Sequence, residues 1–343
     1  ENLSKVEKLV FFPQWLETFN RLSIELKILG GKLITNTLIG AASEDYFNLS
    51  GQEMLDFIRQ NNQNLKNRWL KLINDKQIEF VKPIEFPKVT IFCPLYNGER
   101  YIEKFLEDME QQTVFSECEL IIIDANSPEN EKQYIEAFCE KHSNTIYKRL
   151  DYRASVMETE NMAIEMATGE YFAQTCVDDR HHPEYMEIMR KTLYFRDDID
   201  LVYADCLQTK KPNETFDSNS SNGAVYEHSI NEFSKENMIK CLPGPMPMWK
   251  LKIHEKAGVF NPDLKYAGDW DMFLRMVDNG AKFKKVDKPL GLYYYNSEGL
   301  STSAEYIEPR GKEEANVFFQ YQNVFGEQNF NRYKNYFSQF LRN

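Results

Sequence analysis

Residues 89–99, VTIFCPLYNGE, join a short apolar run to polar and turn-forming residues. Such a run, bounded by turn signals, predicts a buried strand. Residues 101–109 then carry apolar side chains at helical spacing, and a second apolar run follows at Leu120–Ile123. Further strand-like runs at Thr145–Arg149 and Tyr171–Val177 continue the alternation. This pattern predicts an α/β fold with an open, mostly parallel, twisted sheet and helices on both faces.

Polar residues follow three of the predicted strands, at Pro94–Glu99, Asp124–Ser127 and Asp178–Pro183. Because ligands bind beyond the carboxyl ends of the strands in such sheets, we expect these groups to meet at one edge. An aromatic ring such as Tyr96 can stack on a nucleobase, and a carboxylate such as Asp124 can accept a base N–H. Adjacent carboxylates can hold a divalent cation that keeps open positions for diphosphate oxygens. Together these groups predict a nucleotide-sugar site.

Six motifs occur in order along this region. They are Pro94-x-Tyr96-Asn97, Asp124-x-Asn-Ser127, Asn161-x-Ala-Ile-x-x-Ala-x-Gly169-Glu-Tyr, Asp178-Asp179-x-x-His-Pro183, Ala257-Gly-Val-Phe260 and Gly268-Asp269-Trp-Asp271. Each is weak alone, but their order and spacing are specific. By these motifs, residues 87 to about 302 resemble a family 2 glycosyltransferase with the GT-A fold. The resemblance implies an inverting hexosyltransferase that uses a nucleotide-sugar.

The resemblance also implies a role for individual residues. Asp269 would be the general base that deprotonates the acceptor hydroxyl, and Asp179, with Asp178, would bind Mn²⁺ or Mg²⁺. The nucleotide-sugar would be held by Pro94, Tyr96, Glu99, Asp124, Arg153 and Asp178. An acceptor or sugar pocket would include Trp249, Trp270 and Asp271.

The sequence departs from the family pattern at three positions. Cys176 replaces an aspartate that often precedes the Asp178-Asp179 pair, and Gly268 replaces the glutamate usual before the base. Asn296 stands where many relatives have a histidine that can complete the metal shell. These changes put the metal requirement in more doubt than the fold.

Structural roles are open for the same residues. Asp269 precedes an apolar helical stripe and could be an N-cap, and Asp178 and Asp179 could cap the helix entering at Pro183. Four more residues could have a structural role instead of a place in the site. Tyr96 could be ordinary packing, and Arg153 could be a surface charge. Trp249 could close the core, and Asn161 could bond to a local backbone carbonyl.

Composition and apolar patterns set the wider organisation. The chain has 343 residues and a net charge of −12, which argues against a nucleic-acid partner. We expect a helical extension or docking module at 1–86 and a helical, aromatic-rich tail at 303–343. Between them we expect a transferase domain at 87–302, with its nucleotide-binding half at 87–209 and its acceptor half at 210–302. Residues 210–223 have the composition of a mobile surface loop.

Several features concern the cellular setting. The six cysteines show no Cys-x-x-Cys pair, as expected of reduced thiols in a cytoplasmic protein. The sequence contains no apolar run long enough to span a membrane. Residues 1–86 or 303–343 are candidates for contact with a neighbouring domain or the inner face of a membrane. A start at Glu1 instead of Met is consistent with a piece cut from a larger polypeptide.

The leading hypothesis is a metal-assisted transferase that moves a hexose or N-acetylhexosamine, from a donor assumed to be UDP-linked, to a glycan, lipid carrier or protein. The alternative is a non-catalytic nucleotide- or glycan-binding module that kept the fold, motivated by Cys176, Gly268 and Asn296. A sugar nucleotidyltransferase is a third hypothesis. It is weakened by the absence of a glycine-rich phosphate loop after the first strand.

Overall fold

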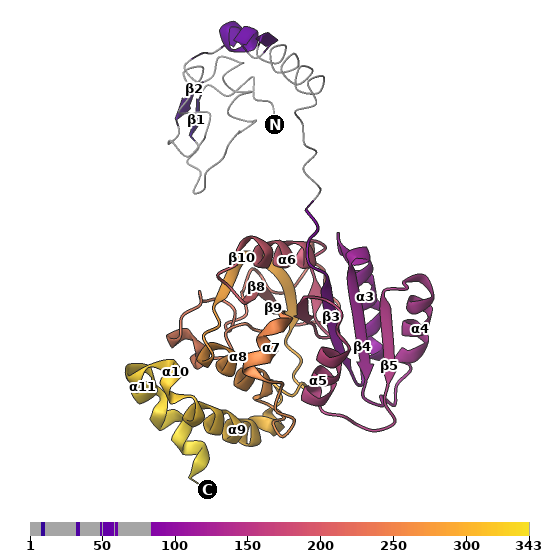
Figure 1. Ribbon diagram of the computed structural model, residues 1–343, viewed down its shortest axis with the longest axis vertical. Coiled ribbons are helices and arrows are strands. Elements are labelled where there is room, and N and C mark those ends of the chain that lie inside the picture. Colours follow the sequence, from indigo (N-terminus) through magenta and orange to yellow (C-terminus); the bar gives the residue numbers. More distant parts are fainter. Residues whose placement is uncertain are drawn as a thin grey trace. The chain divides into compact units, whose positions relative to one another are not determined.

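The computed structural model describes residues 8–10, 32–34, 49, 51–57, 59–60 and 84–342. The chain divides into two compact units, residues 1–84 and 85–343 (Figure 1). In the first unit, β1 (Lys8–Val10) pairs in parallel with β2 (Lys32–Ile34), and residues 51–57 are helical. The prediction that residues 1–86 are helical is therefore wrong for the two strands, each of which ends in a β-branched residue that favours extended backbone. The apolar residues at helical spacing in 15–29 and 65–73, which favour helices, lie outside the described residues.

The second unit is built on a sheet of eight strands. In spatial order they are β5 (Thr145–Arg149), β4 (Cys118–Asp124), β3 (Val89–Leu95), β6 (Tyr171–Gln174), β9 (Met248–Lys250), β8 (Leu201–Thr209), β10 (Phe283–Tyr294) and β7 (Arg180–His181). β3 is parallel to β4 and β6, and β8 is parallel to β10. The short β9 runs antiparallel between β6 and β8, and β7 is antiparallel to β10. The predicted mostly parallel sheet is confirmed.

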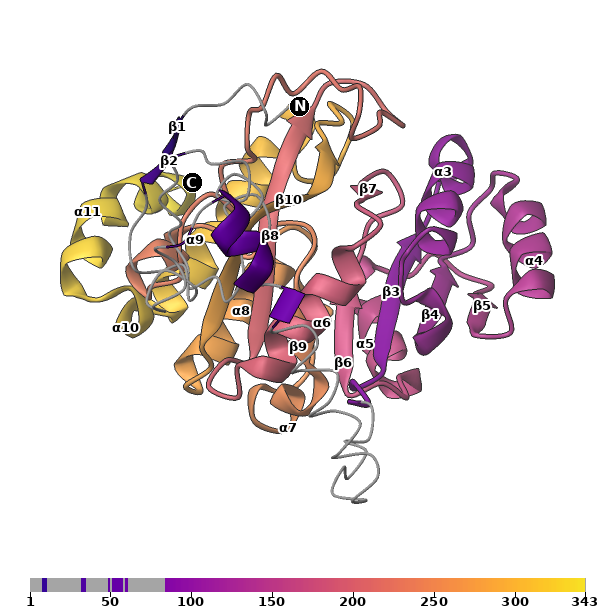
Figure 2. The same cartoon turned by 90° about the horizontal axis from the view of Figure 1, so that it is seen from above.

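Helices cover both faces of this sheet. They are α3 (Glu99–Glu110), α4 (Glu131–Lys141), α5 (Val156–Met166), α6 (Tyr185–Phe195), α7 (His254–Ala257), α8 (Gly268–Asp278), α9 (Ile307–Gln320), α10 (Gln322–Phe325) and α11 (Glu327–Ser338). Alternate side chains of β3 enter two different cores. Ile91 and Cys93 pack with α3 and α6, whereas Phe92 packs with α5 and α8. α4 and β5 lie at the opposite end of the unit from α9–α11 (Figure 2).

The start of α4 lies later than the local sequence suggests. A serine followed by a proline, as at Ser127 and Pro128, is typical of a helix start, but α4 begins at Glu131 with Asn130 at the N-cap position. The Ser127 hydroxyl accepts from the Asn97 amide at 3.0 Å and donates to Glu131, whereas its bond from the Glu129 amide is long, at 3.4 Å. By contrast, the capping box that the sequence allows between Ser155 and Glu158 is present at the start of α5.

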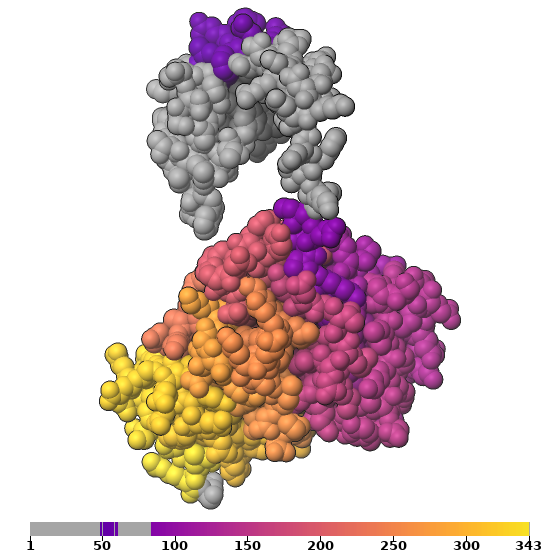
Figure 3. All heavy atoms as spheres, viewed as in Figure 1, coloured from indigo at the N-terminus to yellow at the C-terminus, as the bar shows by residue number. Residues whose placement is uncertain are grey.

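The aromatic C-terminal helices belong to the core of the second unit. The Phe318 ring stacks on those of Phe325, Phe330 and Phe337, with centroids 4.3–5.3 Å apart. These rings join the same apolar cluster as α8, and the two segments lie against each other in yellow and orange in Figure 3. Residues 303–342 therefore complete the fold around α8. None of the described helices has both the length and the apolar character required to cross a membrane.

All six cysteines are free thiols, as predicted.

Replacing Gly169 by alanine should destabilise the second unit. An added Cβ would lie 2.6 Å from the Thr90 amide nitrogen and 2.8 Å from the Lys88 carbonyl oxygen. Both are backbone atoms in or next to the central strand β3, which cannot shift cheaply. We expect the free energy of unfolding, measured by urea denaturation, to fall by about 1–3 kcal/mol. A Gly169→Ala protein as stable as the wild type would contradict this account of how the α5–β6 connection packs.

Candidate active site

The loops that follow β3 and β4 are held together at the carboxyl edge of the sheet. Each contains an asparagine in the left-handed region, Asn97 with φ 53° and Asn126 with φ 61°, which asparagine tolerates better than most residues. Ser127 Oγ accepts from the Asn97 amide at 3.0 Å, and Glu131 Oε1 accepts from the Gly98 amide at 2.6 Å. The hydroxyl of Ser127 also donates to Glu131. These bonds fix the backbone that carries Tyr96 next to the one that carries Asp124.

Asp124 is fully buried and strongly engaged. Its carboxylate accepts from the Ser127 amide at 2.7 Å, the Tyr147 hydroxyl at 2.7 Å and Arg149 Nη1 at 2.5 Å. These three bonds give Asp124 a structural role. Its contact with a nucleobase stays a prediction.

Tyr96 and Arg153 lie together. The Arg153 guanidinium carbon is 3.2 Å from the centroid of the Tyr96 ring, a cation–π contact, and both side chains are exposed. The ring is thus not buried packing, and the arginine is not an isolated surface charge. Pro94 is partly buried at the end of β3, and Glu99 is exposed at the start of α3. These residues lie along the carboxyl edge of the sheet.

An acidic pair follows β6, with Asp179 buried and Asp178 half-buried. Ligand atoms of Cys176, Asp178 and Asp179 lie within 4.8 Å of one another. Asp179 is 1% exposed and accepts a 3.0 Å hydrogen bond from the Tyr294 amide at the end of β10. This bond, and a helix α6 that starts only at Tyr185, exclude the N-cap role for Asp179.

The electrostatics of this pair fit a divalent cation. Burial raises the pKa of Asp178, although a hydrogen bond from Asn296 opposes the shift. Burial, and then the charge of Asp178, raise the pKa of Asp179 well above its usual range. A cation would relieve both effects. The pKa of the Cys176 thiol is also raised, chiefly by burial, so it stays protonated and is a poor ligand for a hard ion.

Asp269 lies in the first turn of α8 and is not its N-cap. The N-cap position is Ala267, and no side chain of the helix itself caps its start. Gln174 Nε2 of β6 donates to Asp269 Oδ1 at 3.5 Å. Burial raises the pKa of Asp269 to about 6, and the Gln174 bond lowers it by less. The result is a partly buried carboxylate whose pKa suits proton transfer near neutral pH.

Glu160 of α5 is a further acidic residue beside Asp269, and none of the sequence motifs pointed to it. Its side chain is 0% exposed, and neither carboxylate oxygen has a hydrogen-bond partner. Burial, followed by the charge of Asp269, raises the pKa of Glu160 well above its usual range. A signal was available, because Glu160 is three residues after Met157 on a helix face that is otherwise apolar.

Two neighbouring residues of α5 hold the chain around α8. Asn161 exchanges two 2.8 Å hydrogen bonds with the backbone of Phe260, so its amide has a structural role. Met157 packs against Gly268, where an added Cβ would overlap the methionine sulfur. A side chain at position 268 would therefore require the Met157 side chain to move.

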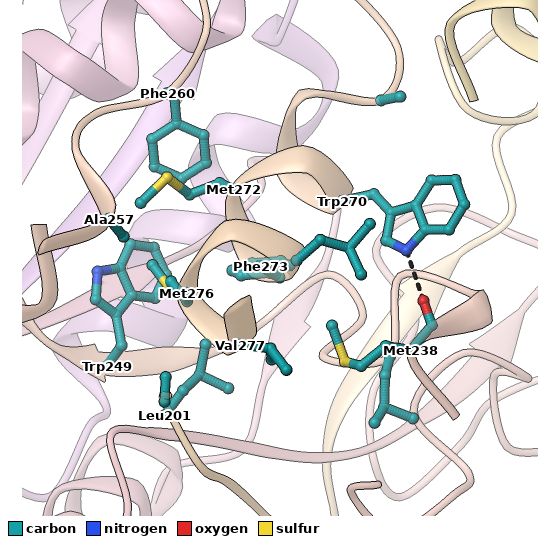
Figure 4. Close-up of a cluster of buried hydrophobic side chains, with 14 of the residues drawn as sticks. Leu201, Met238, Trp249, Ala257, Phe260, Trp270, Met272, Phe273, Met276 and Val277 are labelled. Carbon is teal, nitrogen blue, oxygen red and sulfur yellow. Dashed lines mark hydrogen bonds between the residues drawn. The ribbon is translucent and has the colours of Figure 1, made fainter. Parts of the chain in front are cut away.

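Three residues predicted to form a sugar pocket lie in the core. Trp249 is 0% exposed, packs on Phe172 and donates to His254 Nε2 at 3.0 Å. Trp270 is 6% exposed and donates to the Met238 carbonyl at 2.7 Å (Figure 4). Asp271 is bound by Arg275 and by the Tyr321 hydroxyl. The pocket assignment is therefore corrected: these residues hold α8 in place because they are large or charged groups satisfied inside the protein.

The loop at 210–223, predicted to be mobile, is tied to the rest of the unit. Arg180 Nη1 donates to the carbonyls of Asn213 at 3.3 Å and Glu214 at 3.1 Å. The Asn213 side-chain amide donates to the Arg100 carbonyl at 2.9 Å. Arg180 is itself held by Asp108. The loop is thus anchored between β7 and the start of α3.

Known proteins with similar structures share this sheet. S. aureus TarS 1–349 in complex with UDP-GlcNAc has a TM-score of 0.55 and 17% identity, over 70% of this chain and 71% of that one. The mannosyltransferase PcManGT from Pyrobaculum calidifontis, in complex with GDP-Man and Mn²⁺, has a TM-score of 0.52 and 17% identity, over 77% and 74%. These likenesses show the GT-A type of fold.

Sequence comparison gives one family match. The chain is 27% identical over 237 residues to the chondroitin synthase of Pasteurella multocida strain Pm70; the alignment covers 65% of this chain but only 23% of that protein. Residues 90–256 match the sequence model described as Glycosyl transferase family 2. That match includes Asp178 and Asp179 and ends before α8. Residues 90–256 of this chain are therefore similar to glycosyltransferase family 2.

Proposed function

We propose that this chain is an inverting, metal-assisted transferase that moves a hexose or N-acetylhexosamine from a UDP-sugar to an acceptor hydroxyl. The observation that carries the proposal is the placement of Asp269, a carboxylate with a pKa of about 6, in the first turn of α8 and in contact with β6. The acidic pair Asp178–Asp179 follows that same strand. This arrangement supports a base and a cation site at the end of one strand, β6.

Asp269 acts on the acceptor. Its carboxylate accepts the hydroxyl proton while the hydroxyl oxygen attacks the anomeric carbon from the face opposite the diphosphate. The new glycosidic bond forms as the bond to the diphosphate oxygen breaks, so the configuration inverts and the nucleoside diphosphate carries away the electron pair. A positioned base contributes on the order of 10²–10⁴ in rate. With a pKa of about 6, Asp269 is mostly ionised at pH 7 and can accept this proton.

In this proposal Asp178 and Asp179 would hold a divalent cation, Mn²⁺ or Mg²⁺, which would supply positive charge to stabilise the departing diphosphate. Their own task is to supply oxygen ligands in a fixed orientation, which the Tyr294 amide secures for Asp179. Asn296 adds a neutral hydrogen bond to Asp178.

The remaining residues of the donor site are Pro94, Tyr96, Glu99, Asp124 and Arg153. The exposed Tyr96 ring offers an aromatic face to a nucleobase once the Arg153 guanidinium moves off it, which frees that cation for the diphosphate. The UDP-GlcNAc complex of TarS supports UDP as the nucleotide, and the GDP-Man complex of PcManGT makes GDP the alternative to test. The likeness to a chondroitin synthase supports a growing glycan as acceptor over a lipid carrier or protein.

Replacing Asp269 by asparagine should abolish transfer and leave donor binding intact. We expect turnover of the preferred donor, from a panel of UDP- and GDP-sugars, to fall by about 10²–10⁴-fold, because the amide cannot accept the proton. The control is Asp278→Asn, an exposed residue on the same helix. Calorimetry measures donor binding. A wild-type protein that binds the donor and never turns it over with any glycan acceptor would instead be a binding module.

The pH dependence of the wild-type enzyme follows from the same carboxylate. Since Asp269 must be ionised to act as a base, kcat/KM should rise with pH through about 6 and then level off. Rates measured from pH 4.5 to 8 at saturating metal test this. A profile that is flat across this range, or that falls as the pH rises through 6, would rule out Asp269 as the titrating base.

Removing the metal should stop turnover. EDTA is expected to abolish donor cleavage, and excess Mn²⁺ should restore it, because the leaving diphosphate then lacks its counter-charge. Asp179→Asn should raise the Mn²⁺ concentration needed for half-maximal rate by at least about tenfold, since a neutral amide is a weaker ligand. Full activity in EDTA, with no response to added metal, would show that the reaction needs no cation at this pair.

Glu160 should make the protein less stable as the pH rises. Its pKa in the folded state lies above that in the unfolded state, so the folded state binds the extra proton and stability falls between these two values. The isosteric Glu160→Gln variant lacks this effect. The melting temperature of the variant relative to wild type should therefore increase from pH 4.5 to pH 8. An identical difference at both pH values would show that Glu160 titrates normally.

A further inference from the structure

Glu313 of α9 binds the segment that leads into α8. Its carboxylate accepts hydrogen bonds from three successive backbone amides. The Lys265 amide is 2.9 and 3.1 Å from the two oxygens, the Tyr266 amide 2.6 Å from Oε2 and the Ala267 amide 3.0 Å from Oε2. Glu313 thus binds the three backbone amides that precede Gly268 and Asp269.

This contact lies at the start of α8. Ala267 occupies the N-cap position and supplies no capping side chain. Glu313 accepts from the amide of this N-cap residue and from the two amides before it, so its carboxylate lies at the helix end where the dipole favours a negative charge. It comes from a helix 46 residues further along the chain than Ala267.

A second contact from the same region holds the other side of Asp269. The Tyr321 hydroxyl, at the end of α9, donates to Asp271 Oδ1 at 2.9 Å. Between the two contacts, the Trp270 ring packs against Phe325 and Phe337, with centroids 6.1 and 5.9 Å away. The residues on both sides of Asp269 are therefore bound to the C-terminal helices.

We propose that Glu313 is a positioning residue for Asp269, and that helices α9–α11 are part of the catalytic unit although they lie beyond the family match. The inference rests on the proposed function of Asp269. A base must be held close to its productive geometry, and a displacement of about 1 Å can cost on the order of 10²-fold in rate. The bonds from these three amides fix the backbone two to four residues before that base.

The test compares the Glu313→Gln and Glu308→Gln variants of the full 343-residue chain. Both replace a glutamate of α9 by its isosteric amide, but Glu308 is exposed and forms an ion pair with Lys312. The glutamine at 313 loses the charge and turns one acceptor oxygen into a donor that faces backbone N–H groups. We expect kcat per folded molecule to fall by about 10–100-fold in Glu313→Gln, with the donor dissociation constant within about twofold of wild type. Glu308→Gln should match wild type in both.

Two further measurements separate positioning from stability. If Glu313→Gln does not fold, Tyr321→Phe removes one hydroxyl from the second contact and should lower kcat by about 2–10-fold with unchanged donor binding. The acid limb of the pH profile should also shift in the folded variant, because the surroundings of Asp269 change. A Glu313→Gln or Tyr321→Phe protein with lower melting temperature but wild-type kcat per folded molecule would overturn the inference. Failure of wild type itself to turn over any donor would overturn the proposed function instead.

Discussion

A carboxylate taken out of water must be paired with positive charge, hydrogen bonded, or protonated, and this requirement divides the acidic residues of the second unit into two groups. Asp108, Asp124 and Asp271 are each bound by an arginine at 2.5 Å. No ion pair within residues 84–342 involves Glu160, Asp178, Asp179 or Asp269. The first group holds loops and helices in place. The second retains the capacity to bind a cation or exchange a proton.

The sheet and its edge were predictable because their signals are local. Apolar runs in the sequence predicted β3, β4 and β5, and β5 (Thr145–Arg149) has the predicted bounds. The capping box at Ser155 is also visible in the sequence, because its two partners are only three residues apart. Ser127 looked equally like a cap, but its hydroxyl is engaged by the neighbouring loop, 30 residues away in sequence. A partner at that separation leaves no trace in local sequence, so the helix start was misplaced.

The candidate site was predictable only in part, for a related reason. Motifs identified Asp178, Asp179 and Asp269 as chemically interesting, and the structure puts Asp269 in contact with the strand that precedes the acidic pair. They could not show that Trp249 faces the core, because an aromatic residue near two prolines fits a pocket as well as an interior. Glu160 lies on an apolar helix face, which was an available sequence signal, but only the packed structure shows that its carboxylate has no hydrogen-bond partner.

The contact between Met157 and Gly268 links two positions that are 111 residues apart in the chain. A residue with a side chain fits at 268 only if the residue at 157 becomes smaller or turns away. The two positions should therefore change together as such proteins diverge. Where a glutamate precedes the base, the facing position of the preceding helix should carry a short side chain. In this chain the bare backbone of Gly268 leaves the space that the Met157 side chain fills.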